Sequence, residues 1–203
     1  KLEKKLLILL LIAGSPRALG AKASDQLVFL LSQIDNFAAC YEQDSETTSH
    51  TGRLWLSRPD RFRMQASAPI SQTVVSDGNV LWTHDLDLEQ VIISQLNDRA
   101  LDIPLLLFAG EPQRVYEFYE VERHDHGALT RFALTPLNQT GSVGRIVLGF
   151  SGGVPIEFVF ETAMDRQTII RLFDVSLDDI DAKVYDFKMP ERVDVIDDRA
   201  GVN

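Results

Sequence analysis

Apolar and polar residues alternate along much of the chain with a period of two, which is typical of β-strands with one buried face. The alternation is clearest in residues 53–85. There Leu54 and Leu56 fall on one face of a first predicted strand, and Phe62 and Met64 fall on one face of the next. This stretch therefore predicts neighbouring strands that contribute to a common core.

Two turn signals separate these strands. Pro59 lacks an amide donor and pushes Arg58 towards an extended conformation, so the chain must turn or leave the ladder there. Asp77-Gly78 marks a second turn, because glycine readily adopts the positive φ of tight hairpins. We therefore predict a meander of three or four antiparallel strands.

The same alternation continues on both sides of the meander. Further strands are predicted at 36–43, 81–85, 90–96, 115–123, 129–135, 145–150, 155–162, 168–175 and 183–188. A polar loop is predicted at 44–51. Leu86 and Leu88 occupy the turn between two predicted strands, where they either mark a contact surface or lie buried under a helix.

Helical spacing appears first near the N-terminus. Ser24 is a suitable N-cap for a helix of about three turns with an apolar stripe of Leu27, Leu30, Leu31 and Ile34. We expect this helix to lie against the sheet.

A second helix is predicted at 102–110, where Asp102 caps, Pro104 suits the first turn and Gly110 ends the helix. This segment is apolar all round, so it must be buried on every side or face an apolar ligand. A small helix or turn is also weakly indicated at 177–181.

Roughly ten strands with few helices predict a mainly β fold (α+β) with one large antiparallel sheet that must curl. The helices would then cover its apolar concave face as a lid.

The first 23 residues have the pattern of a secretory signal peptide. Lys1, Lys4 and Lys5 precede an apolar run at 6–13, and small residues end at Ala23, after which we predict cleavage. The apolar run is well short of the ~20 residues that span a bilayer. We expect residues 24–203 to form a single domain, which their length suits.

The net charge of the mature chain argues against one class of partner. Removal of 1–23 takes away five basic residues and one acidic residue, which changes the formal net charge from −10 to −14. Nucleic acid is therefore not an expected partner, because its phosphates require clustered Lys and Arg.

Cys40 is the sole cysteine, and its apolar neighbours in 37–41 favour a buried packing role. Its position far from the first mature residue disfavours a lipid anchor.

Catalytic motifs are absent from the sequence: it has no G-x-S-x-G, H-E-x-x-H, phosphate-loop or Cys-x-x-Cys pattern. His124 and His126, with Glu120 and Glu122, could ligate a metal, but the turn glycine that follows favours exposed turn residues. The acidic run at 178–181 lacks the glycine and the final glutamate of a calcium loop. We expect neither an enzyme nor a cofactor or metal.

Two motifs in the meander resemble a known family. LWLSRPDRFRM (54–64) and VVSDGNVLW (74–82) are similar to the LW-x-x-RP-x-x-F and SDG-x-x-LW signatures of the periplasmic outer-membrane lipoprotein carrier proteins, the LolA family. The likeness runs from about Ser24 to about Asp198. It implies an incomplete antiparallel β-barrel with a helical lid over a hydrophobic cavity, in a periplasmic protein.

The resemblance also implies a function. A soluble, monomeric carrier would receive the acyl chains of lipidated proteins from an inner-membrane ABC lipoprotein-release complex and pass them to an outer-membrane lipoprotein receptor. The alternative is a periplasmic lipid-sensing or envelope-regulatory binding protein with the same open barrel. A lipid hydrolase is less favoured than either, and so is a lipid-anchored receptor.

Site residues follow from the same resemblance. The arginine of the RP motif, here Arg58, would lock the lid to the sheet, and backbone carbonyls near 102–108 are its candidate partners. Phe62 is a candidate for the cavity lining or the transfer surface. The other candidates for the acyl-chain cavity come from the apolar faces of the predicted strands, such as Leu148 and Phe150 or Phe158 and Phe160, and from the apolar helix. The full set is Leu54, Leu56, Phe62, Met64, Leu105, Leu106, Phe108, Leu148, Phe150, Phe158 and Phe160.

Overall fold

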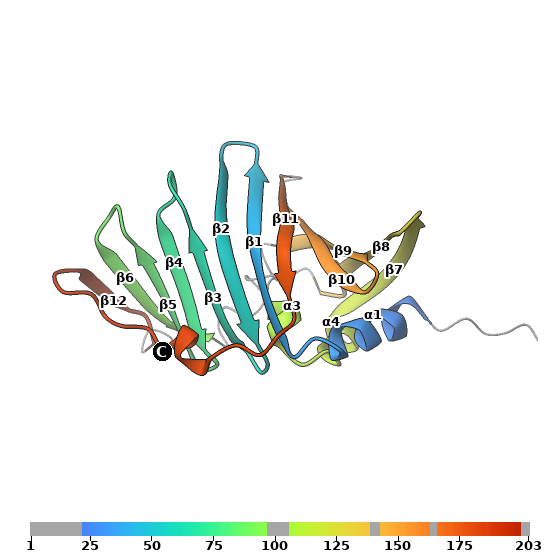
Figure 1. The fold of residues 1–203 in the computed structure, drawn as a ribbon, viewed down its shortest axis with the longest axis horizontal. Coiled ribbons are helices and arrows are strands. Elements are labelled where there is room, and N and C mark those ends of the chain that lie inside the picture. Colours follow the sequence, from blue (N-terminus) through green and yellow to red (C-terminus); the bar gives the residue numbers. More distant parts are fainter. Residues whose placement is uncertain (1–21, 97–105, 139–142, 163–165, 200–203) are drawn as a thin grey trace, which may run out of the picture.

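The computed structural model describes residues 22–96, 106–138, 143–162 and 166–199, which fold around one curved sheet (Figure 1). The strands of the sheet are β1 (Asn36–Ser45), β2 (Ser49–Ser57), β3 (Arg61–Ala66), β4 (Gln72–Asp77), β5 (Val80–Asp85), β6 (Gln90–Gln95), β7 (Tyr119–His126), β8 (Leu129–Pro136), β9 (Val143–Ser151), β10 (Val154–Thr162), β11 (Gln167–Ser176) and β12 (Asp194–Asp197). The helices in this part of the chain are α1 (Ala23–Ser32), α3 (Leu106–Ala109), α4 (Arg114–Phe118) and the 3₁₀ helix η1 (Ala182–Tyr185).

The sheet is open rather than closed. Its strand order is β12-β6-β5-β4-β3-β2-β1-β11-β10-β9-β8-β7, and β12 pairs in parallel with β6 while the other neighbours run antiparallel. Strand β1 pairs with both β2 and β11, so it joins the N-terminal meander to the later strands. In the described residues β7 and β12 remain the two ends of the sheet. The predicted fold class, a mainly β incomplete barrel with few helices, is confirmed.

One face of the sheet carries the main core. In β1 the buried residues Phe37, Ala39 and Tyr41 alternate with more exposed ones, and Leu56 and Leu54 of β2 lie opposite Phe37 and Ala39. We call this face the core face. Helices α1, α3 and α4 all pack on it, and the sheet and helix residues together form a single cluster that includes Leu27, Leu31, Phe108, Val115, Phe132, Leu148 and Phe158.

The chain after β11 covers part of the opposite face, which we call the outer face. Tyr185 of η1 is buried, its hydroxyl lies 2.8 Å from Oγ of Ser57, and the guanidinium of Arg61 lies over its ring. Phe187 stacks on Trp82 of β5 with ring centroids 5.6 Å apart and an interplanar angle of 10°. The strands β3 to β5 are therefore packed on both faces.

Two predictions about the N-terminal region are wrong in detail. Lys22, not Ser24, occupies the N-cap position of α1, with no side-chain capping bond, and Ser24 lies inside the first turn. The predicted loop at 44–51 is mostly strand, because Asp44 pairs with Ser49 and the β1–β2 hairpin turns within three residues. Backbone pairing between neighbouring strands decides the structure of such a polar sequence, whatever its side chains favour.

Two predictions in the second half are also wrong. Residues 115–118 form α4 rather than strand, because the amides of 114–116 donate to the carbonyls of 111–113 and Val115 packs in the core. Residues 183–188 contain η1 instead of a strand, since the side chain of Asp181 accepts from the amide of Lys183. At 177–181, where a small helix or turn is weakly indicated, no helix forms, and the amide of Asp178 donates to the hydroxyl of Ser176. The short strand β12 was not predicted. Residues 102–105 lie outside the described part of the chain.

None of the helices in the described ranges is long and apolar enough to cross a membrane.

Candidate functional site

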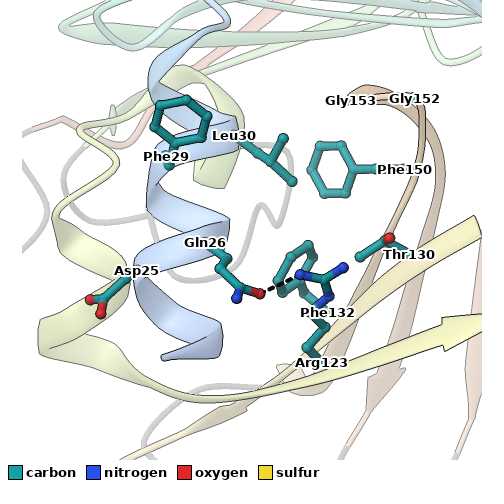
Figure 2. Close-up of a pocket in the computed structure, with 10 residues that line it drawn as sticks. All are labelled: Asp25, Gln26, Phe29, Leu30, Arg123, Thr130, Phe132, Phe150, Gly152 and Gly153. Carbon is teal, nitrogen blue, oxygen red and sulfur yellow. Dashed lines mark hydrogen bonds between the residues drawn. The ribbon is translucent and has the colours of Figure 1, made fainter. Parts of the chain in front are cut away.

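A pocket of about 610 Å³ lies between α1 and the strands β7, β8 and β9 (Figure 2). This volume falls within the range of about 300–1,000 Å³ that is usual for ligand pockets. The residues that line it are Asp25, Gln26, Phe29 and Leu30 from α1, Arg123, Thr130, Phe132 and Phe150 from the strands, and Gly152 and Gly153 from the β9–β10 turn.

Helix α1 forms one wall of the pocket because its apolar residues point in two directions. Leu27 and Leu31 have no exposed surface and pack in the core, as the helical spacing predicts. Phe29 and Leu30 face the pocket instead. Phe29 is 64% exposed, so a large aromatic ring stands at the mouth without being buried by the protein itself. Exposed apolar surface beside an apolar pocket is typical of a site of interaction.

The sheet supplies an aromatic floor. The rings of Phe132 and Phe150 meet edge to face with centroids 5.9 Å apart. Behind them Phe108 of α3 contacts Phe150 at 6.2 Å and Phe158 at 4.6 Å, and it also stacks on Phe37 of β1 at 6.3 Å. The pocket floor is therefore continuous with the main core, and helix α3 connects the two.

The mouth of the pocket has a polar side built around Arg123. The Nη1 of Arg123 donates to Oε1 of Gln26 at 2.5 Å, which links β7 to α1. Its Nε donates to Oδ1 of Asp125 at 3.0 Å, and the hydroxyl of Thr130 donates to the same oxygen at 2.9 Å. The hydrogen bonds from Arg123 and Thr130 lower the pKa of Asp125, so this carboxylate stays ionised and holds the guanidinium in place.

Helix α4 provides another polar link to the same end of α1. The hydroxyl of Tyr116 donates to Oδ1 of Asp25 at 3.0 Å. This hydrogen bond to a carboxylate raises the pKa of Tyr116. The N-terminal half of α1 is thus linked to both β7 and α4 by side-chain hydrogen bonds.

Arg58 links the other end of α1 to the sheet. It lies in the turn between β2 and β3, and its side chain donates to the backbone carbonyl oxygens of Ile34 at 2.7 Å, Leu31 at 2.9 Å and Gly110. Carbonyls in the last turn of a helix have no intrahelical partners, so Arg58 satisfies the end of α1 and joins it to the residue after α3. Burial lowers the pKa of Arg58, although an arginine remains charged at any physiological pH.

One described partner of Arg58, the carbonyl of Gly110, lies two residues beyond the candidate segment 102–108, and the other two are carbonyls at the end of α1. Leu31, Ile34 and Gly110 are separated from Arg58 by 27, 24 and 52 residues. The amide of Asp60 adds a backbone link from the same turn to the carbonyl of Ala109 at 2.9 Å. The turn 58–60 therefore contacts both helices.

The candidate cavity residues lie in three kinds of place. Phe150 lines the pocket. Met64 and Phe160 are partly buried against the core, and Leu106 begins α3, whereas Leu105 lies outside the described residues. The candidates that are fully buried in the core are Leu54, Leu56, Phe62, Phe108, Leu148 and Phe158.

Several pocket residues were not among the candidates. Phe132 lies two residues from Thr130 on a predicted strand, so strand alternation could have identified both of them. Phe29 and Arg123 had no such signal, because Phe29 is off the apolar stripe of α1 and Arg123 resembles any charged residue of an edge strand.

Other residues singled out in the sequence lie away from the pocket. Cys40 is only partly buried on the outer face, between Arg53 and Phe173, so the prediction that its aromatic neighbours bury it is wrong. Those neighbours, Phe37 and Tyr41, point to the core face because side chains alternate along a strand.

The turn between β5 and β6 is exposed. Leu86 and Leu88 are 49% and 69% exposed, so no described helix buries them. His124 and His126 are exposed too, and nowhere in the described ranges do three or more His, Cys, Asp or Glu side chains form a group that could hold a metal ion.

The fold is that of an open-sheet β protein with helices over an apolar pocket on one face. Residues 32–188 match the family model described as "Outer membrane lipoprotein carrier protein LolA". The chain is 32% identical to an outer-membrane lipoprotein carrier protein of Alcanivorax borkumensis over 96% of this chain and 98% of that protein, and 31% identical to one of Azotobacter vinelandii over 91% and 92%. The chain therefore belongs to the LolA family of outer-membrane lipoprotein carrier proteins.

Solved structures agree with this fold. An uncharacterized conserved protein of Thermus thermophilus superposes with a TM-score of 0.57 at 11% identity, covering 87% of this chain and 99% of its own. MucB superposes with a TM-score of 0.52 at 18% identity, covering 87% of this chain and 66% of its own. At such low identity these similarities concern the fold alone.

Proposed function

We propose that this protein is a soluble periplasmic carrier, without enzymatic activity, that binds the acyl chains of lipidated proteins. It would receive them from an inner-membrane ABC lipoprotein-release complex and deliver them to an outer-membrane lipoprotein receptor. Residues 1–23 would direct export and be removed after Ala23. The observation that carries the proposal is the apolar pocket under α1 in a member of a lipoprotein carrier family.

The hydrophobic effect explains why such a carrier needs a covered pocket. Each CH₂ group moved from water to an apolar site contributes about 0.8 kcal/mol. An acyl chain is thus strongly driven into the pocket, and its release requires something that opposes binding. A lid whose closed, empty form is stabilised by polar contacts supplies this opposition.

Arg58 is our proposed lock for that closed form. Its three hydrogen bonds join the turn before β3 to the end of α1 and to Gly110, so they should break when these helices move away from the sheet. Hydrogen bonds to charged groups contribute about 1.5–3 kcal/mol each. We propose that opening then exposes the buried candidates, including Leu54, Phe62 and Phe158, to the acyl chains.

The test is lipoprotein loading and onward transfer by wild type and Arg58→Leu. The substitution removes bonds of the closed state and leaves the apolar lining unchanged, so the open form gains population. Apparent affinity for lipoprotein should rise about tenfold and transfer to the receptor should slow, because lid closure no longer opposes binding. Arg58→Lys should rescue poorly, since an ammonium cannot bond three carbonyls with a planar fork of donors.

Unchanged transfer by a correctly folded Arg58→Leu protein would refute the lock. Binding of free lipids without any uptake or transfer of lipoprotein would instead favour the lipid-sensing alternative. Copurification of lipoprotein with intact acyl chains would distinguish a carrier from a hydrolase.

A further inference from the structure

The pocket combines an apolar floor with a guanidinium at its mouth, and this combination suits an amphiphile better than a hydrocarbon. We propose that Arg123 is a head-group subsite, which binds the acyl carbonyl or carboxylate oxygen of a bound chain in exchange for the side chain of Gln26. The inference rests on the proposed function, because it assigns the polar end of the ligand whose chain fills the pocket.

The sheet register explains how a charged residue of the edge strand β7 comes to face the pocket. Arg123 lies directly opposite Phe132, and Asp125 lies opposite Thr130, whose other neighbour is Phe150. All five side chains therefore point to the core face. Figure 2 shows the guanidinium of Arg123 beside Gln26 and the ring of Phe132, with Phe150 farther along the pocket.

The hydrogen bonds of Arg123 divide its donors into two sets. Asp125 accepts from Nε at 3.0 Å and is itself fixed by Thr130, so this carboxylate orients the guanidinium. Nη1 donates to the neutral amide oxygen of Gln26. A guanidinium has five N–H donors in a rigid fork, and the side chain of Arg123 is 38% exposed, so a ligand oxygen can reach it.

A bound acyl group is a suitable replacement for Gln26. Fatty acids, phospholipids and lipidated proteins share a carbonyl oxygen next to the alkyl chain, and an ionised carboxylate bonds a guanidinium more strongly than a neutral amide does. With the alkyl chain along Leu30, Phe132 and Phe150, this oxygen would lie at the polar mouth. A cationic trialkylammonium head group has no oxygen that can accept from Arg123, so it gains nothing from this subsite.

The exchange also affects the lid. Gln26 belongs to α1, so a ligand that takes its place on Arg123 removes a link between α1 and β7. This link is near the N-terminal end of the helix, whereas Arg58 holds the C-terminal end. Arrival of the polar end of the ligand would therefore loosen the cover over the pocket that its chain enters.

The experiment is a calorimetric titration of the purified protein, at concentrations below micelle formation, with four ligands of equal chain length: hexadecanoic acid, its methyl ester, hexadecanol and hexadecyltrimethylammonium. Wild type should bind the acid about tenfold more tightly than the alcohol, a difference of about 1.4 kcal/mol. The ester should lie between them, and the cationic ligand, which has no acceptor for Arg123, should bind more weakly than the acid and should be unaffected by Arg123→Leu. Arg123→Leu should abolish the preference for the acid, and Arg123→Lys should restore part of it through charge alone.

Two variants separate the head-group contact from the lid link. Gln26→Met removes the acceptor on α1 but keeps Arg123, so it should strengthen binding of all four ligands about two- to fivefold and leave the ratio of acid to alcohol unchanged. Arg145→Leu is the matched control, because it removes an arginine from the neighbouring β9 at an exposed position outside the pocket lining. It should behave as wild type. Circular dichroism spectra and thermal midpoints check that each variant is folded.

The outcomes distinguish this inference from the proposed function. If wild type binds all four ligands equally, or if folded Arg123→Leu keeps the preference for the acid, the subsite is refuted and the apolar pocket stands. A preference for the acid that disappears in Gln26→Met would refute the exchange. Failure of every ligand to bind wild type would contradict the proposed function itself.

Discussion

The two faces of the sheet are covered in different ways. On the core face, α1 lies over β7 to β9 and leaves a pocket of about 610 Å³. On the outer face, the chain after β11 lies against β3 to β5 (Figure 1). Its aromatic side chains contact Trp82 and Arg61 of these strands. We call the segment after β11 that contains Tyr185 and Phe187 the outer cover, and helix α1 the pocket cover. Tyr185 is only 3% exposed, whereas Phe29 of the pocket cover is largely exposed.

The two covers also differ in the kind of contact that holds them to the sheet. Around the pocket, α1 is linked to its surroundings by side chains such as Gln26, Asp25 and Arg58, whose polar partners can be replaced by water or by a ligand. Helix α1 also buries Leu27 and Leu31 in the core, but these side chains do not line the pocket. The outer cover has polar contacts too, between Tyr185 and Ser57 for example, and adds the buried ring of Tyr185 and the stacked ring of Phe187, whose apolar contacts water cannot replace. We therefore expect the outer cover to contribute mainly to stability and the pocket cover mainly to binding.

The largest expected effect is on the outer cover. Tyr185→Ala removes a buried ring and should lower the free energy of unfolding by about 3 kcal/mol. Tyr185→Phe keeps the ring and loses only the hydrogen bond to Ser57, so it should cost about 1 kcal/mol. Urea denaturation of both variants measures the difference. A Tyr185→Ala protein as stable as wild type would contradict the role assigned to this cover.

A smaller effect is expected for the stacked pair on the same face. Phe187→Ala removes the ring that lies 5.6 Å from Trp82, and it should cost about 1.5 kcal/mol. The intrinsic fluorescence should shift to longer wavelength in the native state, because Trp82 gains contact with water. Phe173→Ala is the control, since Phe173 is exposed on β11 and its removal should change stability by less than about 0.5 kcal/mol.

A substitution in the pocket cover should weaken ligand binding and leave stability nearly unchanged. Phe29→Ala should leave the free energy of unfolding within about 0.5 kcal/mol of wild type, because the ring is largely exposed. Binding of hexadecanoic acid should weaken about fivefold, which corresponds to about 1 kcal/mol of lost apolar contact. Loss of stability without loss of binding would assign Phe29 to the fold instead of the pocket.

The smallest expected effect concerns pH. His50 is 8% exposed on the core face, its ring contacts Tyr41, and burial lowers its pKa. Because the folded protein binds this proton less readily than the unfolded chain, the stabilisation is present above about pH 6.5 and is lost as the pH falls below it. His50→Gln should reduce the loss of stability between pH 7 and 5 by less than about 1 kcal/mol, as measured by thermal unfolding at each pH. An unchanged pH profile would contradict this assignment.

Much of the sheet could be predicted from local sequence. Alternation located β2, β3 and β8 to β11, and Asp77-Gly78 located the turn between β4 and β5, where Gly78 has a φ of 104°. These signals are local, because side chains of one strand point alternately to two faces and glycine adopts a positive φ with little strain. Family motifs added Arg58 as a candidate, and Phe150 followed from the apolar face of its strand.

Tertiary structure alone decided how distant residues meet. Gln26 and Arg123 are 97 residues apart, and nothing near either of them indicates the other. The parallel pairing of β12 with β6 and the helical state of 114–118 likewise depend on neighbours that local spacing does not reveal. The pocket arises where α1, held by Leu27 and Leu31 in the core, meets β7 to β9 and places Phe29 and Leu30 in the lining. That relation exists only once the sheet has formed.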